Sequence, residues 1–216
     1  MNKKFYILLL AIVALAGFFF YRQIIRARQI TVQRTTAPLI SASAIFIPAS
    51  ASEQTLGNPG ATISVVEFVD IGCQHCLSLH STIKEFTLKH PQDIVMTWKD
   101  NAKPGIFSDY TLAHQAAFCA GKQNKFWEFM DMASANRNNL LEPGLKKIAQ
   151  DLNLNPESWW QCVNDPATKQ TIADSAALAN QLGIKSLPAI FVNNRLINTS
   201  KDINLEEMLE NFIKKP

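Results

Sequence analysis

The chain has 216 residues, of which 47% are apolar and 18% are charged, and its formal net charge is +3. The part after residue 52 has the size of one folded domain, and its apolar content is sufficient for a core. Lysines and arginines are scattered and form no stripe interleaved with aromatic residues. This distribution argues against nucleic-acid binding.

The first 21 residues form a basic and then apolar segment. Lys3 and Lys4 precede an uncharged stretch, Phe5 to Tyr21, whose length falls within the range of a membrane-spanning helix. Cleavage after Ala16 would release a soluble protein, but the apolar aromatic run that follows favours an uncleaved anchor. We therefore predict that residues 1–21 are a membrane anchor or signal segment, with an uncleaved transmembrane signal-anchor preferred.

Residues 22–56 are rich in Ser, Ala and Thr, which predicts a tether. Its one apolar patch, Leu39 to Pro48, is expected to form a short strand, a helix or a membrane-surface contact. The folded domain is then expected over residues 57–216.

The most informative motif is Cys73-Gln74-His75-Cys76. It follows a run rich in β-branched residues, Ile63–Val69, which predicts a buried strand. Leu79, Ile83 and Phe86 then recur at helical spacing. Cys73 is therefore expected at a helix N-terminus, where backbone N–H groups and the helix dipole stabilise a thiolate that attacks disulfides.

A Cys-x-x-Cys motif also occurs in zinc sites, which usually need a second pair of ligands at similar spacing. Cys119 and Cys162 stand alone in the sequence, and His75 lies inside the motif, poorly placed to join both cysteines on one metal. We therefore expect redox chemistry with no metal and no organic cofactor.

A second feature lies near the C-terminus, where Leu187-Pro188 opens an apolar run that ends at Asn193-Asn194. Asn tolerates the positive φ of a two-residue hairpin turn, and proline is best tolerated at the start of a strand. The pattern predicts a β-hairpin opened by Pro188. The alternative is an ordinary trans-proline at a strand start, because most X–Pro bonds are trans.

Cys73, Cys76, Pro188 and the hairpin occur in an order that resembles the thioredoxin superfamily, in which a cis-proline faces the Cys-x-x-Cys motif. The segment Cys119–Glu128 and the long helical stretch before Pro188 are similar to the DsbA-like branch. The resemblance implies an α/β thioredoxin-like fold with a helical insertion, about residues 105–182, between the βαβ and ββα halves.

The resemblance also implies site residues: catalytic roles for Cys73, Cys76, His75 and Pro188, and supporting roles for Gln74, Leu187 and Glu67. Gln74 departs from the proline of the best-known DsbA members, which leaves the redox potential open. The family often has a buried acid at the Glu67 position, and it can accept a proton for the buried cysteine. A mid-strand Glu67 would be desolvated, whereas an edge position would face water.

Other polar residues are expected to be structural. Lys99 is expected to end a strand near the site and to be exposed, and Trp98 is expected in the core. Three histidines outside the motif are expected at the surface or as capping residues: His80, His90 and His114.

Cys119 and Cys162 both lie in the expected helical insertion. In an exported protein they are expected to form a structural disulfide, whose loop of about 44 residues corresponds to about 4 kcal/mol in the chain-entropy model. The alternative is a pair of inert buried thiols.

The function expected from these observations is thiol–disulfide exchange that introduces disulfides into exported proteins through Cys73 and Cys76. By resemblance, the partners are reduced exported proteins and a membrane reoxidase of the DsbB type. The expected location is the periplasmic or extracytoplasmic side of the inner membrane. A membrane-tethered reductase or isomerase is one alternative, and a non-enzymatic metal-binding or chaperone module is another.

Overall fold

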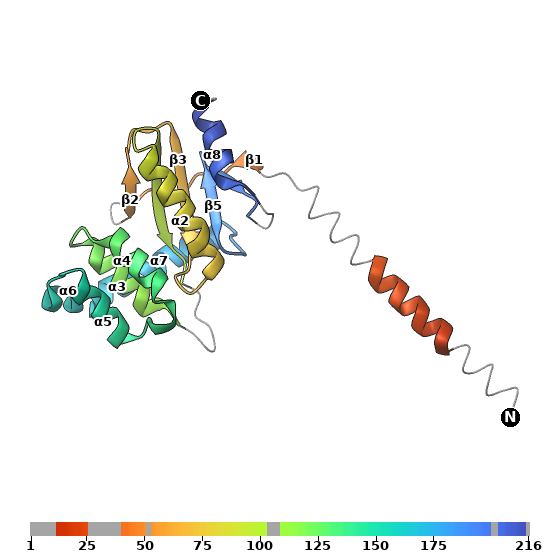
Figure 1. Ribbon diagram of the computed structural model, residues 1–216, viewed down its shortest axis with the longest axis horizontal. Helices are drawn as coiled ribbons and strands as arrows, with labels where there is room; N and C mark the ends of the chain where they lie inside the picture. Colours follow the sequence, from red (N-terminus) through yellow and green to blue (C-terminus); the bar gives the residue numbers. More distant parts are fainter. Residues whose placement is uncertain (1–11, 26–39, 51–52, 103–108, 200–202, 215–216) are drawn as a thin grey trace, which may run out of the picture. The chain divides into compact units, whose positions relative to one another are not determined.

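The computed structural model describes residues 12–25, 40–50, 53–102, 109–199 and 203–214. The chain divides into two compact units, and the second begins at Ile40. In the first unit, residues 12–25 form a helix whose side chains are exposed (Figure 1). No helix within the described ranges is both long and apolar enough to cross a membrane. The anchor predicted from Phe5 to Tyr21 begins in residues that lie outside these ranges.

The second unit is built on a six-stranded sheet with the order β1-β6-β5-β3-β4-β2. β3 and β4 are parallel, and the other neighbouring pairs are antiparallel. The strands are β1 (Ile40–Ala44), β2 (Gln54–Gly57), β3 (Ile63–Val69), β4 (Ile94–Asp100), β5 (Ala189–Val192) and β6 (Arg195–Ile197). The hairpin predicted after Pro188 is β5–β6, with positive φ at Asn193 and Asn194.

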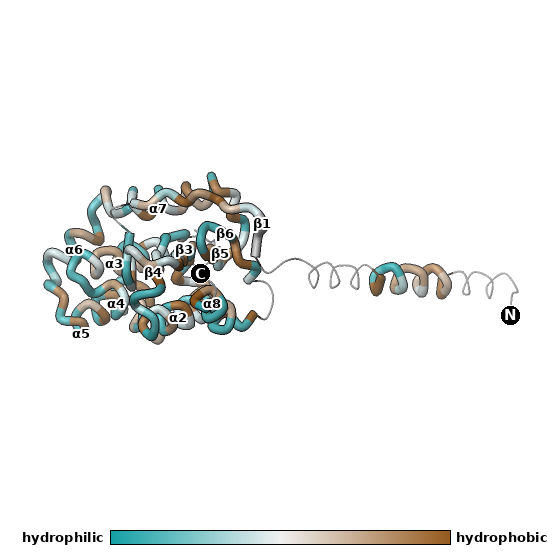
Figure 2. Tube along the Cα trace, turned by 90° about the horizontal axis from the view of Figure 1, so that it is seen from above, coloured by the Kyte–Doolittle hydropathy of each residue, from teal (hydrophilic) through white to brown (hydrophobic). Residues whose placement is uncertain are grey.

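Helices cover both faces of this sheet (Figure 2). On one face lie α2 (Gln74–Lys89) and α8 (Leu205–Lys214), where Ile83 and Phe86 pack on β3, β4 and β5. On the other face lies α7 (Pro166–Gln181), which contributes Ala179 to a second cluster. Because both faces are covered, the central strands carry apolar residues on both sides.

The helical insertion lies between β4 and β5, and its first described helix begins at Thr111. The predicted start near residue 105 lies outside the described residues. It consists of α3 (Thr111–Gly121), α4 (Phe126–Ala135), the short 3-10 helix η1 (Arg137–Asn139), α5 (Glu142–Asp151), α6 (Pro156–Asn164) and α7. Asn155 and Asp165 cap α6 and α7, each followed by proline at the first helical position, as helix starts favour. The predicted α/β thioredoxin-like fold with its helical insertion is confirmed.

The structure corrects the predicted tether of residues 22–56. β1 pairs with β6 and β2 pairs with β4, so two strands of the sheet come from this range. The domain boundary predicted at residue 57 is therefore too late, and the compact unit starts at Ile40. The physical reason is that β6 and β4 would otherwise have unpaired backbone groups along the two edges of the sheet.

Cys119 of α3 and Cys162 of α6 form a disulfide that joins two helices of the insertion across 43 residues of sequence. Cys119 is buried, and the Thr168 hydroxyl lies 3.9 Å and 3.7 Å from the two sulfur atoms. Trp159 of α6 also donates its indole N–H to the Ala116 carbonyl of α3, at 3.0 Å. The disulfide thus reinforces a helix contact that already has packing and a hydrogen bond.

Replacing both Cys119 and Cys162 by Ala should lower the melting temperature by about 5–15 °C, because the unfolded chain regains the entropy that the loop closure removed. Differential scanning calorimetry measures this change. The exchange rate per folded molecule should stay within about twofold of the parent protein. A folded double variant that has lost exchange activity would contradict a purely structural role.

Candidate active site

The site centres on a disulfide between Cys73 and Cys76 at the start of α2. Cys73 is the N-cap residue, and its Sγ accepts a hydrogen bond from the Cys76 N–H at 3.2 Å. Cys73 is partly buried, whereas Cys76 is fully buried. The first turn of α2 contains no acidic residue that would oppose a thiolate. A nucleophile that approaches from solvent therefore meets Cys73 first, and the helix stabilises negative charge on its sulfur.

The two residues inside the motif are exposed, and one of them reaches toward the Pro188 segment. His75 Nε2 lies 3.3 Å from the Thr199 carbonyl, which places a proton on Nε2 for donation. Thr199 in turn donates its hydroxyl to the Pro188 carbonyl at 3.1 Å. The Leu187–Pro188 bond is cis. Thr199 thus connects the two predicted parts of the site, although no motif in the sequence marks it.

Glu67 lies at the middle of β3 and is fully buried, so of the two environments predicted for it the structure shows the desolvated one. Its Oε1 lies 2.6 Å from His80 Nδ1. His80 is buried between Trp98, 5.1 Å away, and Trp127, on which its ring stacks at 5.8 Å. Glu67 Oε2 and His80 Nε2 are buried atoms that have no hydrogen-bond partner among the residues that the structure describes. Glu67 and His80 can thus exchange a proton on the buried side of α2, the helix that begins at the disulfide.

The expectation that His80 is a surface or capping residue is wrong. His80 follows Cys76 by four residues and precedes Ile83 by three, and all three are buried on one face of α2. This spacing was visible in the sequence and could have predicted the burial of His80.

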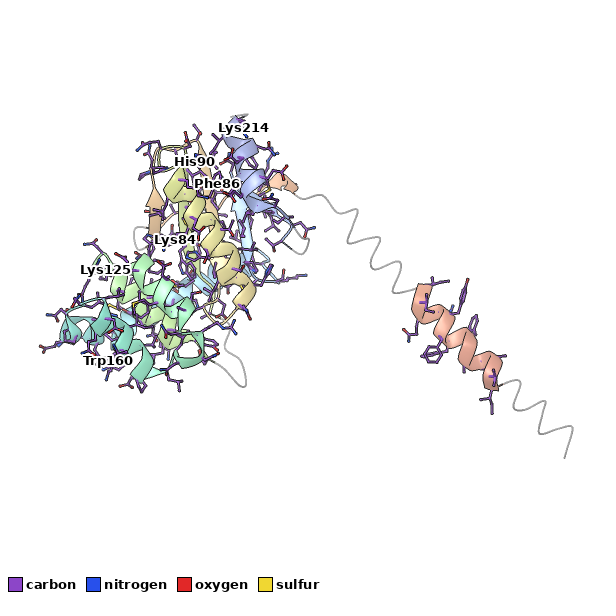
Figure 3. All side chains as sticks on the ribbon, viewed as in Figure 1. Lys84, Phe86, His90, Lys125, Trp160 and Lys214 are labelled. Carbon is purple, nitrogen blue, oxygen red and sulfur yellow. A yellow bond between two sulfur atoms is a disulfide. The ribbon has the colours of Figure 1, made fainter. Side chains whose placement is uncertain are left out.

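His90 is the C-cap residue of α2, near Lys214 and Glu210 of α8 (Figure 3).

Lys99 is buried, contrary to the expected exposure, because its charge is paired. Its Nζ donates to the Pro48 carbonyl at 2.7 Å and forms an ion pair with Glu53. These partners line a cavity of about 250 Å³ that Thr171 and Leu178 of α7 also line. Trp98 is in the core, as predicted.

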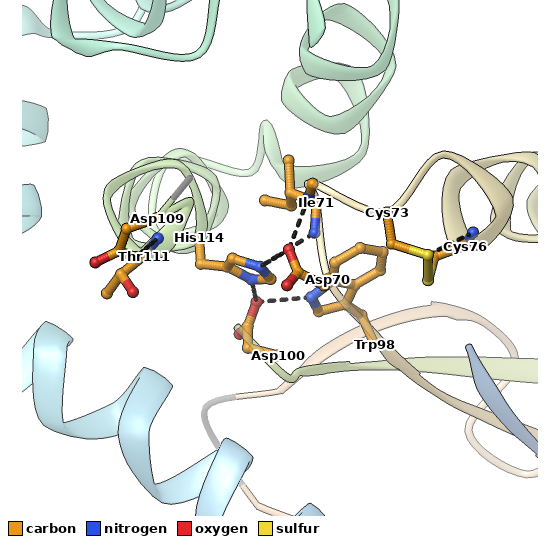
Figure 4. Close-up of polar contacts among 10 residues, drawn as sticks. Asp70, Ile71, Cys73, Cys76, Trp98, Asp100, Asp109, Thr111 and His114 are labelled. Atoms are coloured by element: carbon orange, nitrogen blue, oxygen red, sulfur yellow. Dashed lines mark hydrogen bonds and ion pairs between the residues drawn. A yellow bond between two sulfur atoms is a disulfide. The ribbon is translucent and has the colours of Figure 1, made fainter. Parts of the chain in front are cut away.

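A third buried polar group lies where the insertion meets the sheet (Figure 4). His114 of α3 is fully buried, with Nδ1 2.7 Å from Asp100 Oδ1 at the end of β4. Its Nε2 lies 3.1 Å from the Ile71 N–H and 3.5 Å from Asp70 Oδ1, both in the loop that leads to Cys73. The expectation that His114 lies at the surface is also wrong, because two carboxylates compensate its burial.

Burial by itself lowers the pKa of His114, but the hydrogen bonds and charges of Asp100 and Asp70 outweigh it and raise the pKa to about 9. The bond from the Ile71 N–H needs a neutral ring, whereas an ion pair with Asp70 needs a cation. We favour the cation near neutral pH, because two buried carboxylates face a single ring.

Replacing His114 by Asn should destabilise the protein most at low pH. A raised pKa in the folded state gives stability that is fully present below pH 6.5 and is lost as the pH rises through about 9. The difference in unfolding free energy between the two proteins should therefore fall by about 3 kcal/mol between pH 6 and pH 10. Urea unfolding across this range measures it. A constant difference would show that the ring stays neutral.

The comparisons with known proteins agree with this geometry. The protein-family model described as Thioredoxin matches residues 50–215. The probable disulfide bond formation protein D of Bacillus cereus is 24% identical over 184 residues, covering 77% of this chain and 82% of that protein. The thiol-disulfide exchange protein alpha-DsbA2 of Wolbachia pipientis has the same fold, with a TM-score of 0.62 and 16% identity over 76% of this chain and 87% of that chain.

Longer proteins also contain a related segment. The sodium/proton antiporter NhaA 3 of Salinispora tropica is 24% identical over 135 residues, which are 62% of this chain. The chain spans only 21% of that antiporter, so its transport activity provides no argument about this protein.

The cysteine pair at the helix N-terminus lies within the part of the chain that the thioredoxin family model matches. The family model covers more than half of the chain, and the protein therefore belongs to this thioredoxin family.

Proposed function

We propose that this protein is an exported oxidase that introduces disulfides into extracytoplasmic proteins through Cys73 and Cys76. The observation that carries the proposal is the asymmetric pair, with a partly buried Cys73 at the helix N-terminus and a fully buried Cys76 behind it. This asymmetry supports Cys73 as the sulfur that clients attack and Cys76 as the leaving group.

The proposed reaction moves two electrons from a client dithiol to the enzyme disulfide. A client thiolate attacks Cys73 Sγ, the bond to Cys76 breaks, and Cys76 leaves as a thiolate. A second client thiolate then attacks the client sulfur of the mixed disulfide. Cys73 leaves as a thiolate that accepts the Cys76 N–H bond and faces the positive end of the helix dipole. The products are a client disulfide and the reduced enzyme.

We assign Glu67, together with His80, the proton that the buried Cys76 gains and loses in this cycle. Both side chains are buried and hydrogen-bonded to each other. Glu67 Oε2 and His80 Nε2 have no partner among the described residues, so each side chain has one polar atom that can take up or release a proton. His80 is one helical turn after Cys76. A fully buried thiolate is costly, so a nearby group that supplies a proton lowers the barrier to its departure.

The Pro188 segment is the proposed docking place for clients. An extended client backbone would pair beside Pro188 as an added strand, which gives binding that depends little on client sequence. The contacts from His75 to Thr199 and from Thr199 to Pro188 support a fixed spacing between this segment and the disulfide.

Export and tethering belong to the same proposal. A second disulfide, Cys119–Cys162, is typical of oxidising compartments and supports an extracytoplasmic location. We propose that residues 1–21 direct export and anchor the domain on the periplasmic side of the inner membrane. Reoxidation would then be the task of a membrane partner of the DsbB type.

The direction of exchange depends on the reduction potential, which Gln74 and Leu187 are expected to influence. A tethered reductase or isomerase uses the same residues in the other direction. Equilibration of the Cys73–Cys76 pair with glutathione buffers decides between them, because an oxidase has the higher potential. Tight zinc or copper(I) binding by the reduced protein without dithiol turnover would instead favour a metal-binding module.

Replacing Cys73 by Ser should abolish exchange, because the attacked sulfur is lost. Replacing Cys76 by Ser should instead accumulate mixed disulfides with a disulfide-bonded model peptide, visible by mass spectrometry. The Cys73 thiolate attacks the peptide disulfide and expels one peptide thiolate, and no second enzyme thiol remains to release the mixed disulfide. In the reduced protein, iodoacetamide at mildly acidic pH should modify Cys73 first. Faster modification of Cys76 would reverse the assignment.

Replacing Glu67 by Gln should slow oxidation of a dithiol peptide about tenfold at neutral pH, since proton transfer to or from a positioned group commonly contributes tenfold or more. Stopped-flow fluorescence measures the rate, and thermal melting verifies that the variant is folded. The matched control is Glu85→Gln on the exposed side of α2, which should react like the parent protein. Equal rates for both variants would remove Glu67 from the mechanism.

A further inference from the structure

The buried His114 has no part in the exchange steps, yet its contacts lead directly to Cys73 (Figure 4). The three backbone N–H groups at the end of the loop before α2 all have partners in this group. Ile71 N–H faces His114 Nε2 at 3.1 Å, and Gly72 N–H donates to Asp70 Oδ1 at 2.7 Å. Cys73 N–H donates to the Asp70 carbonyl at 3.0 Å. The loop that carries Cys73 is therefore held by the backbone and side chain of Asp70, whose carboxylate faces the His114 ring.

The start of α3 supports the same loop from a second side. Tyr110 precedes α3, and its ring lies so close to Gly72 that a Cβ at that position would collide with it. The helical insertion thus contacts the loop through both Tyr110 and His114. Glycine at position 72 is required by this close approach.

We propose that His114 is a positioning residue of the thiol–disulfide centre, which places a positive charge between Asp70 and Asp100 and holds the turn that carries Cys73. The inference rests on the proposed exchange at Cys73 and adds a residue to it. His114 acts through Asp70 and the loop and does not contact the client.

Asp70 and Asp100 are both at least nine-tenths buried, and both form an ion pair with the His114 ring. With the ring protonated, the group carries one net negative charge, and with the ring neutral it carries two. Extra negative charge beside the loop disfavours a thiolate at Cys73. His114 therefore makes Cys73 a better leaving group and a stronger oxidant.

Other charged groups near this cluster have partners of their own. Asp70 follows β3 and Asp100 ends β4, whereas Asp109 precedes α3 and accepts a hydrogen bond from the Thr111 N–H at 2.8 Å. Trp98 donates its indole N–H to Asp100 Oδ1 at 2.8 Å. Lys99 directs its ammonium to Glu53 and Pro48 instead.

The test is the thiolate titration of the reduced full-length protein, followed by absorbance at 240 nm with the Cys73→Ser protein as the blank. Replacing His114 by Asn keeps a donor toward Asp100 but removes the charge. The titration midpoint of Cys73 should rise by about half a pH unit or more. Adding Asp70→Asn to this variant should move the midpoint back toward the parent value, because it removes one negative charge.

A merely structural role would make the double variant deviate further, and that result would overturn the proposal. An unchanged midpoint in His114→Asn would overturn it as well. His90→Asn, at the opposite end of α2, is the matched control and should titrate like the parent protein.

Asp100→Asn provides an independent measurement if the His114 variant does not fold. It removes one negative charge while keeping the side chain's size. The Cys73 midpoint should fall where the ring stays protonated beside Asp70, and should stay at the parent value where the ring loses its proton together with its Asp100 partner. A rise would overturn the proposal. The readout is separate from turnover: a protein that titrates as expected but oxidises no dithiol peptide would contradict the proposed function and leave the role of His114 standing.

Discussion

The parallel pairing of β3 with β4 brings the Cys73 loop and His114 to the same end of the sheet. In this register Val69 lies opposite Asp100, so both strands end at the same edge of the sheet. The loop after β3 leads to Cys73, and the chain after β4 leads to α3 and His114. The Asn101 N–H also donates to the Val69 carbonyl at 2.9 Å, which continues the pairing past the strand ends. Chemistry at Cys73 and support from the insertion therefore meet because of one strand register.

Sequence reasoning found the parts of the site that have local signals. The cysteine spacing, the strand before it, the helix after it and the Asn193-Asn194 turn each follow from residue type and spacing over a few positions. The sequence places Glu67 on a strand but does not show that it is buried against His80. Its burial depends on β4 and β5 pairing on either side of that strand, and neither pairing has a local signal. The burial of His80 follows from its helical spacing with Cys76 and Ile83. This spacing is a stronger indication than the general tendency of histidine to lie at the surface.

The remaining errors concern contacts between residues far apart in the sequence. His114 meets Asp70 across 44 positions and Thr199 meets His75 across 124, and no periodicity reports such pairs. Lys99 is buried only because Glu53 and Pro48 reach it from a segment that was predicted to be a tether. Edge strands β1 and β2 are five and four residues long, so they gave no clear strand pattern. Their pairing is decided by the partners available at the sheet edges.

The closed edges have a consequence for a protein that handles unfolded chains. An exposed strand edge recruits any extended polypeptide through its backbone, and this leads to aggregation when clients are abundant. Here short strands occupy both borders of the sheet, and β2 ends at Gly57, whose positive φ turns the chain away. If clients pair beside Pro188 as proposed, their pairing along the sheet borders is thereby discouraged. The domain would then select where it accepts a strand without reading the sequence of that strand.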